Sequence, residues 1–310
     1  MVLTLENLPN FIVVGAPKAG TTSLYYYLKQ HPQIYLPSQK ELHFFTYRIL
    51  IEKSAGPGDE SSLKKICSSL SEYCEYYRNV TDEKAIGEVS PSYLYHSGVS
   101  ETILQTLGNI KIVICLRNPI DRAYSNYLHK LGNGFEPLTF KDALLAEDSR
   151  KAGGWGDFWL YSEHSLYYEK VKKYLSVFGD ENVHFVLTEN MKENMVRELE
   201  VLYEFLDVEQ SFVADTSTIW NKSFYPKSMK AFQLFNRPSF LKDVIKHIIP
   251  SSVVQSMKKV GNVLNSSSTT EVKEEEFDYL YIVFKDDVNK LGRLMNHDFS
   301  FWLDKEKYYD

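Results

Sequence analysis

The feature that most constrains the fold is a short apolar run followed by a glycine-bounded turn and a helical pattern. Residues 11–14 are Phe-Ile-Val-Val, an uninterrupted apolar run that is typical of a buried parallel strand. The turn from Gly15 to Gly20 then leads through Thr21 into a helix that ends at Pro32. The first amides of a helix have no partner within it and point at whatever the loop encloses. Because glycine lets the backbone close around a phosphate, we expect an anion site here.

The position of the lysine distinguishes this loop from the P-loop of nucleoside triphosphatases, G-x-x-x-x-G-K-[ST]. Gly15 and Gly20 have the P-loop spacing, but Thr21 stands where the lysine belongs, and Lys18 lies inside the loop. A lysine three residues earlier cannot reach along the β- and γ-phosphates in the same way. Taken alone, the segment could also be a chance glycine-rich turn. The loop therefore predicts a nucleotide-phosphate site of another type.

A second apolar run, residues 112–116, predicts another buried strand, and it ends at Arg117. The pair Asn118-Pro119 suits the N-cap and first position of a following helix. Arg117 thus projects from the carboxyl end of a strand, where open α/β sheets bind ligands. Ser125 lies two turns into the helix, and its hydroxyl could donate to a phosphate that the arginine holds bidentately. We expect a second phosphate site from these two residues, whereas we assign Arg122 to a structural ion pair.

The two segments together resemble the cofactor motifs of sulfotransferases that use 3′-phosphoadenosine 5′-phosphosulfate (PAPS). The first resembles the 5′-phosphosulfate loop, P-K-x-G-T-[TS], and the second the 3′-phosphate site, R-x-P-x(5)-S. The resemblance implies PAPS as co-substrate, no metal, and stabilisation of the phosphate–sulfate bridging oxygen by Lys18. The implied cofactor-binding residues are Lys18, Ala19, Gly20, Thr21, Thr22, Ser23, Arg117, Ser125 and, from the basic loop 221–227, Lys222.

Residues 40–45, Lys-Glu-Leu-His-Phe-Phe, form the candidate acceptor side. An extended conformation would place Glu41 and His43 on one face, where a carboxylate beside an imidazole suits general-base chemistry. A solvated strand end is the alternative. The segment resembles K-E-x-H-F-F of heparan-sulfate and related carbohydrate sulfotransferases, which implies Glu41 as the catalytic base and His43 near the acceptor. Residues 87–93 resemble the family's G-E-x-[ST]-P-x-Y, with Val89 where carbohydrate-specific members often have lysine.

Charge and targeting signals limit the partners. The 310 residues carry a formal net charge of −6, which argues against a general binder of nucleic acid or anionic membranes. No export signal precedes the first strand, and no apolar run approaches the roughly 18 residues of a membrane span. Three cysteines without a C-x-x-C pair agree with a reducing compartment. We expect a cytoplasmic protein that acts on a small-molecule or glycan acceptor, preferably a small or weakly charged one; its oligomeric state stays open.

The pattern predicts a single α/β domain over residues 1–310, with a central parallel sheet, P-loop-like topology, helical insertions and a helical C-terminus. A third buried strand is expected at residues 183–187 and a packing helix at 277–295. The insertions expected on the acceptor side are residues 46–86, 130–165 and 220–275. Helical spacing is also present at residues 61–78, 139–150 and 161–174.

Two smaller features have ambiguous roles. The glycine-rich loop 153–156 could be mobile and cover an acceptor, with Trp155 either contacting the substrate or packing on its own domain. His164 and His184 are interpreted as structural or solvated residues. No group of residues has the spacing of metal ligands.

The predicted function is sulfuryl transfer from PAPS to an acceptor hydroxyl, or with less support an amine, in line and with Glu41 as general base. Two alternatives remain open. A P-loop kinase or NTPase would need the lysine elsewhere and a carboxylate for Mg²⁺. A catalytically silent nucleotide-binding protein would keep Arg117 and Ser125 but would not need Glu41.

Overall fold

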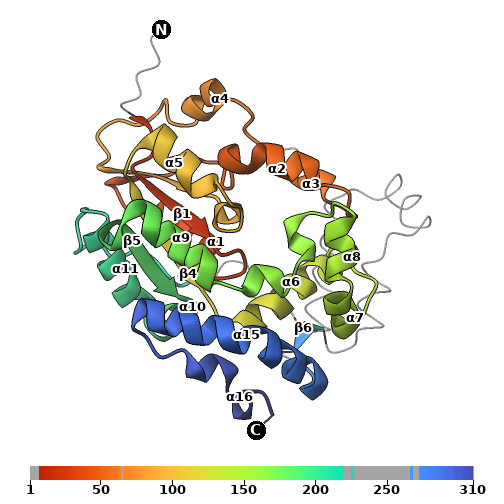
Figure 1. The fold of residues 1–310 in the computed structure, drawn as a ribbon. Helices are drawn as coiled ribbons and strands as arrows, with labels where there is room; N and C mark the ends of the chain where they lie inside the picture. Colours follow the sequence, from red (N-terminus) through yellow and green to blue (C-terminus); the bar gives the residue numbers. More distant parts are fainter. Residues whose placement is uncertain (1–6, 64–65, 219–224, 227–265, 268–271, 310) are drawn as a thin grey trace.

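The computed structural model describes residues 7–63, 66–218, 225–226, 266–267 and 272–309. At its centre lies a five-stranded sheet in the order β2-β3-β1-β4-β5, with every neighbouring pair parallel (Figure 1). The strands are β1 (Phe11–Gly15), β2 (Ile34–Tyr35), β3 (Ala85–Val89), β4 (Lys111–Leu116) and β5 (Val183–Leu187). The predicted α/β fold with a parallel sheet is confirmed, and so are the three strands predicted from apolar runs.

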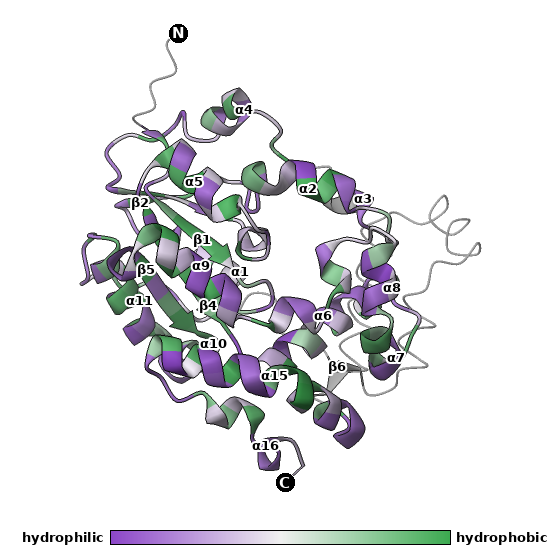
Figure 2. Ribbon diagram, viewed as in Figure 1, coloured by the Kyte–Doolittle hydropathy of each residue, from purple (hydrophilic) through white to green (hydrophobic). Residues whose placement is uncertain are grey.

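The two strands that precede the predicted phosphate segments are direct neighbours. Ile12 of β1 is in register with Ile112 of β4, and the apolar residues of both strands are buried. Figure 2 shows these strands as an apolar centre, with polar residues on the helices around it. Because parallel strands end at the same edge of a sheet, the loop after β1 and Arg117 after β4 lie side by side.

Helices flank the sheet, and α15 lies along α9 and α6 (Figure 1). The helices are α1 (Thr21–Leu28), α2 (Tyr47–Glu52), α3 (Glu60–Leu63), α4 (Leu70–Glu75), α5 (Val99–Leu107), α6 (Pro119–Gly132), α7 (Phe140–Leu145), α8 (Glu147–Ala152), α9 (Tyr168–Phe178), α10 (Thr188–Glu193), α11 (Met195–Phe205), α15 (Glu274–Met295) and α16 (Glu306–Tyr309). None of the helices in the described part of the chain is both long and apolar enough to cross a membrane.

The N-terminus of α6 forms as its sequence predicts. The Asn118 side chain accepts the backbone N–H groups of Ile120 and Asp121, and Pro119 occupies the first turn. Asn118 also donates to the carbonyl of Trp302 in the C-terminal region. The helix start is therefore fixed both locally and by a distant contact, and it holds the end of β4 in place.

Three predicted helices are interrupted. Among the described residues of 61–78 the helices are α3 and α4, and between them the buried Cys67 donates its amide to the carbonyl of Leu42. The side chain of Ser69 then caps α4 and restarts the helix. Residues 139–150 divide into α7 and α8, and residues 161–174 begin with a 3₁₀ turn before α9. The predicted packing helix is confirmed as α15, although Leu294 is exposed rather than buried.

Candidate active site

The loop between β1 and α1 folds back on the sheet. The N–H of Ala16 donates to the carbonyl of Cys115 in β4 (2.7 Å). Gly15 packs against Leu94 so closely that an added Cβ would lie 2.5 Å from a side-chain carbon. Gly20 has φ of +85° and ends the loop immediately before α1. The conformation requires glycine at both positions and directs the first amides of α1 toward the space that the loop encloses.

Arg117 reaches the same loop from the end of β4. Its Nη1 donates to the carbonyl of Lys18 (3.1 Å), and its own carbonyl accepts the hydroxyl of Tyr167. The side chain is buried, yet Nε has no hydrogen-bond partner among the described residues. A buried guanidinium N–H without an acceptor is costly, so this atom fits a ligand oxygen. Ser125 is buried in α6 and makes no hydrogen bond to Arg117.

The surroundings of Lys18 are strongly positive. Burial, followed by the guanidinium groups of Arg117 and Arg122, lowers the pKa of Lys18 to about 8, against a smaller opposite effect of Glu41. Among the described residues, Lys18, Arg117 and Arg122 form no ion pair, although the Glu41 carboxylate acts on Lys18. The loop amides, Lys18 and the unpartnered Arg117 nitrogen together fit the phosphate and sulfate groups of a nucleotide donor.

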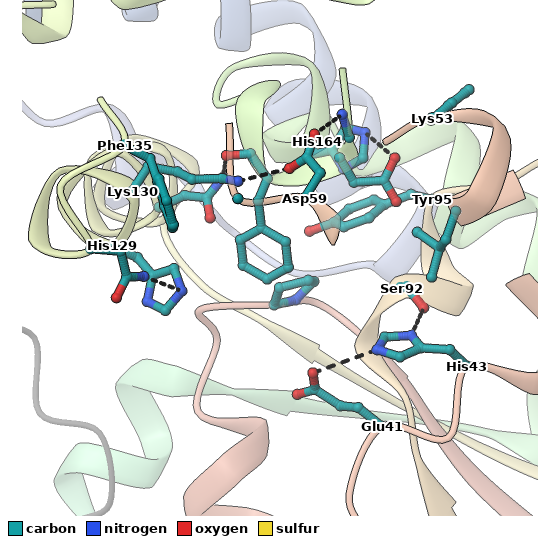
Figure 3. Close-up of a pocket in the computed structure, with 18 of the residues that line it drawn as sticks. Glu41, His43, Lys53, Asp59, Ser92, Tyr95, His129, Lys130, Phe135 and His164 are labelled. Carbon is teal, nitrogen blue, oxygen red and sulfur yellow. Dashed lines mark hydrogen bonds and ion pairs between the residues drawn. The ribbon is translucent and has the colours of Figure 1, made fainter. Parts of the chain in front are cut away.

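Residues 40–45 do not form the predicted extended segment. Glu41 and His43 have φ of +65° and +56°, and a 3₁₀ helix follows at Phe44–Thr46. The reason is that Leu42 turns into the core while the amide of Glu41 donates to the carbonyl of Val89 (3.0 Å). The two side chains nevertheless face each other, with 3.8 Å between Nε2 of His43 and Oε2 of Glu41 (Figure 3).

Neighbouring cations determine the charge of this pair. Glu41 forms an ion pair with Lys40 and keeps 39% of its side chain exposed. Burial acts to raise the pKa of Glu41, but Lys40 and His43 outweigh it, so the pKa is lowered. Burial lowers the pKa of His43 against the effect of Glu41. At neutral pH the site therefore presents a carboxylate beside a neutral imidazole.

Residues 87–93 form hydrogen bonds that hold the segment with Glu41 and His43 in place. Glu88 is fully buried and accepts hydrogen bonds from the hydroxyl groups of Tyr73, Ser90 and Tyr93. Ser90 in turn accepts the amide of His43 (3.3 Å). Ser92 Oγ lies 2.9 Å from Nδ1 of His43, which leaves Nε2 facing Glu41. The motif thus holds residues 41–43 in their unusual backbone conformation.

A cavity of about 350 Å³ adjoins both parts of the site. Glu41 and His43 lie on one side of it, and Asp59 and Lys130 on the other (Figure 3). Its apolar lining comes from residues of the predicted acceptor-side insertions, Leu50, Leu63, Phe135 and Phe158. Pro17 of the phosphate loop also lines it, so the cavity connects the donor site with the candidate base.

One face of α6 also lines the cavity, and the sequence argument missed most of it. The polar residues on this face recur at helical spacing, starting within the Arg-Ser motif and ending at the C-cap residue: Arg122, Asn126, His129, Lys130 and Asn133. This periodicity was the available signal. Burial first, and then Lys18, lower the pKa of His129 to about 4, so its ring is neutral at physiological pH.

The loop 153–156 is anchored by its contacts. The Asp59 carboxylate accepts the amides of Gly56 and Gly156 and the indole N–H of Trp159, and it pairs with Lys130 (2.9 Å). Trp155 packs edge-on against Trp159, with ring centroids 4.7 Å apart. The packing alternative for Trp155 therefore holds.

Two of three further predicted assignments can be placed. Arg122 forms no ion pair with any described residue, which corrects the expected role. His164 is buried against Tyr95 and lies 3.9 Å from Asp157, in agreement with a structural role. Lys222 lies outside the described residues. No group of three or more potential metal ligands occurs in the part of the chain that the structure describes.

The parallel sheet and the loop at its edge define an α/β protein with P-loop-like topology. Residues 8–277 match the family model described as the sulfotransferase domain. The chain therefore belongs to the sulfotransferase family and is an enzyme that transfers sulfate. This family generally uses PAPS as the sulfuryl donor.

Individual relatives agree with the family assignment. A crystal structure of a sulfotransferase from Alicyclobacillus acidocaldarius has a TM-score of 0.76 at 32% identity, and the match covers 95% of this chain and 98% of that chain. The membrane-associated sulfotransferase kil1 of Dictyostelium discoideum is 37% identical over 39% of this chain and 22% of its own length. The human heparan sulfate glucosamine 3-O-sulfotransferase 5 is 29% identical over 66% of this chain. That match spans about half, 55%, of the human protein.

Proposed function

We propose that this enzyme transfers the sulfuryl group of PAPS to a hydroxyl group of its acceptor, with Glu41 as the general base. The observation that carries the proposal is the position of an ionised carboxylate in a cavity that also contacts the phosphate loop. A general base must accept a proton from the attacking hydroxyl, and a carboxylate with a lowered pKa is available for this at neutral pH. An amine acceptor is a less favoured variant of the same chemistry.

In this proposal the donor is held by residues around the loop. Lys18, Thr21, Thr22 and the amides of residues 19–23 bind the 5′-phosphosulfate, whereas Arg117 and Ser125 bind the 3′-phosphate. Bound PAPS supplies an activated sulfuryl group with a phosphate as its leaving group. Arg117 is well suited to its role because its buried Nε lacks a protein partner.

Three side chains then act on the transfer itself. Glu41 takes the proton of the acceptor hydroxyl as that oxygen forms its bond to sulfur. Lys18 stabilises the negative charge that develops on the phosphate oxygen as the sulfur–oxygen bond breaks. His43, fixed by Ser92, orients Glu41 and the acceptor. Apart from this proton transfer, in-line transfer needs only positioning and charge stabilisation from the protein.

We propose a small or weakly charged acceptor. Two of the lysines that line the cavity are already neutralised, Lys40 by Glu41 and Lys130 by Asp59. Much of the remaining lining is apolar, and Val89 is a buried core residue where carbohydrate-specific members often have lysine. A cavity of about 350 Å³ is at the small end for ligand sites, which typically measure about 300–1,000 Å³. These features favour a compact alcohol over a long polyanionic chain.

The experiment that tests the proposal has two arms. First, 3′-phosphoadenosine 5′-phosphate (PAP) should raise the melting temperature more than ADP or AMP, because a ligand that binds only the native state stabilises it. Second, PAPS and a panel of alcohols, amines and heparan-derived oligosaccharides should be screened for a mass gain of about 80 Da, the mass of the transferred group that the in-line mechanism adds. Equal thermal shifts with all three nucleotides, or turnover of ATP with Mg²⁺, would reject PAPS as the donor. Efficient sulfation of the oligosaccharides alone would reject the proposed acceptor class.

A further inference from the structure

Arg122 is a buried cation whose contacts are all neutral. Only 1% of it is exposed. Its Nε donates to Ser165 Oγ and its Nη2 to the carbonyl of Tyr161, both at 2.7 Å. Nη1 donates over longer distances to the hydroxyl of Tyr95 (3.2 Å) and the carbonyl of Pro17 (3.4 Å). Among the described residues no carboxylate lies within ion-pair distance of this guanidinium.

Burying a charge without a counter-ion is unfavourable unless other features offset the cost. Arg150 is a buried arginine with a counter-ion: its two Nη groups donate to the Glu136 carboxylate at 2.8 and 2.9 Å. Arg122 instead faces Lys18 and adds to the positive charge around it. An arginine that only filled the core would not need this position next to another cation.

We propose that Arg122 is a positioning residue for sulfuryl transfer. It ties the phosphate loop to the acceptor-side wall, formed by residues 56–59 and 130–165, and sets its charge beside Lys18. The inference rests on the proposed function. One end of the tie is the Pro17 carbonyl, directly before Lys18, and the other is formed by Tyr95, Tyr161 and Ser165. The geometry fixes Lys18 relative to the cavity, which Pro17, Tyr95 and Arg122 all line.

The charge of Arg122 has a second consequence. A neighbouring cation makes an ammonium group a stronger donor toward the charge that develops on the leaving phosphate. Burial, Arg117 and Arg122 lower the pKa of Lys18 to about 8, with Glu41 raising it and Lys40 lowering it. His129 also faces Lys18 but is neutral at this pH, because burial above all lowers its pKa to about 4. Nucleotide binding should therefore weaken as pH rises through about 8, where Lys18 loses its proton.

The test compares Arg122→Met, which removes the charge, with Arg122→Lys, which keeps the charge but loses the planar fork. PAP affinity is measured between pH 6.5 and 10, and kcat and KM for PAPS are measured with an acceptor from the screen. In Arg122→Met the fall of PAP affinity on the alkaline side of the pH profile (the basic limb) should move to higher pH by about half a unit or more. The kcat should fall by about tenfold or more. Arg122→Lys should keep the limb and recover part of kcat.

Lys151→Met, an exposed lysine paired with Glu163, is the control and should leave both quantities unchanged. Should Arg122→Met fail to fold, Arg122→Gln, which also removes the charge, takes its place, and the kcat of Tyr95→Phe, which removes one tie, tests the positioning role. A loss of kcat with an unmoved limb in Arg122→Met would reduce Arg122 to a packing residue and overturn the inference. So would variants that match wild type within twofold. If the wild-type protein does not bind PAP, the proposed function itself is rejected. This outcome is distinct from a failure of the Arg122 inference, because it needs no variant to be seen.

Discussion

Two regions of the molecule treat buried charge in opposite ways. On the donor side, Lys18, Arg117 and Arg122 surround the phosphate loop, and none of these three cations forms an ion pair with a described residue. On the acceptor-side wall, formed by residues 56–59 and 130–165, Lys130 pairs with Asp59 and Arg150 with Glu136.

The difference shows where a ligand belongs. The paired ions of the wall satisfy each other and fix loops, so they have no need of a further partner. The cations of the donor side are buried without an ion-pair partner among the described residues, and a phosphate or sulfate group would supply the missing negative charge. Whether a buried cation has an ion-pair partner therefore distinguishes structural from ligand-binding cations more directly than its solvent exposure does.

The largest expected effect is that of Glu41→Gln. This change keeps the shape of the side chain but removes its ability to accept a proton, so kcat should fall by about 10²–10⁴. PAP affinity should stay within about twofold, because Glu41 acts on the acceptor and not on the phosphates. Single-turnover transfer and isothermal titration measure the two quantities. A variant that turns over within a factor of a few of wild type would make His43 the leading candidate base.

Arg150→Met tests the structural side of the comparison. Removing one partner leaves the fully buried Glu136 carboxylate without a counter-ion, which should lower the free energy of unfolding by about 3–5 kcal/mol. Urea denaturation measures this, with the neighbouring exposed lysine variant Lys151→Met as control, expected to cost less than about 1 kcal/mol. PAP affinity of the folded fraction should be unchanged. A similar, small loss in both variants would contradict the assignment of this pair to stability.

Arg117→Ala tests the ligand side. It removes a charge-assisted contact to the 3′-phosphate that is worth about 1.5–3 kcal/mol, so PAP should bind roughly 10- to 150-fold more weakly. ADP lacks the 3′-phosphate and should lose little affinity. Titration of wild type and variant with both nucleotides gives the comparison. Equal losses for PAP and ADP would show that Arg117 acts on the loop through the Lys18 carbonyl and not on the 3′-phosphate.

The donor side was largely predictable because its signals are local. The apolar runs of β1 and β4, the glycine at position 20 and the Asn118 cap each follow from a few adjacent residues. Their juxtaposition follows from a general rule, since parallel strands place their carboxyl ends at one edge. The assignment of the individual site residues stays a prediction, as do the single-domain boundaries 1–310 and the cytoplasmic location.

The acceptor side depends on distant contacts and was less predictable. Asp59 meets Lys130 across 71 positions of sequence, and no local pattern announces such a pair. The backbone of residues 41–43 is set by Leu42 entering the core and by the Val89 carbonyl, which overrides the extended conformation that alternation suggested. The polar face of α6 is visible in the sequence as a periodicity, but only the structure shows that this face lines the cavity.

The smallest expected effect concerns pH, at the boundary between the two regions. Glu41 is paired like the wall residues, yet its side chain is 39% exposed and faces the donor side. Lys40 and His43 overcome the effect of burial and hold the pKa of Glu41 below its usual 4.5, while burial lowers the pKa of His43 below 6.5. A base whose pKa lies below 4.5 stays ionised well below pH 6.5. If Glu41 is the proton acceptor, the transfer rate at saturating substrates should therefore change by less than about twofold between pH 7.5 and 5.5. His43→Ala should give the same flat pH profile at a lower rate, since His43 only orients Glu41 and the acceptor.

A wild-type rate that falls steeply below pH 6.5, and a His43→Ala rate that does not, would instead identify the imidazole as the proton acceptor.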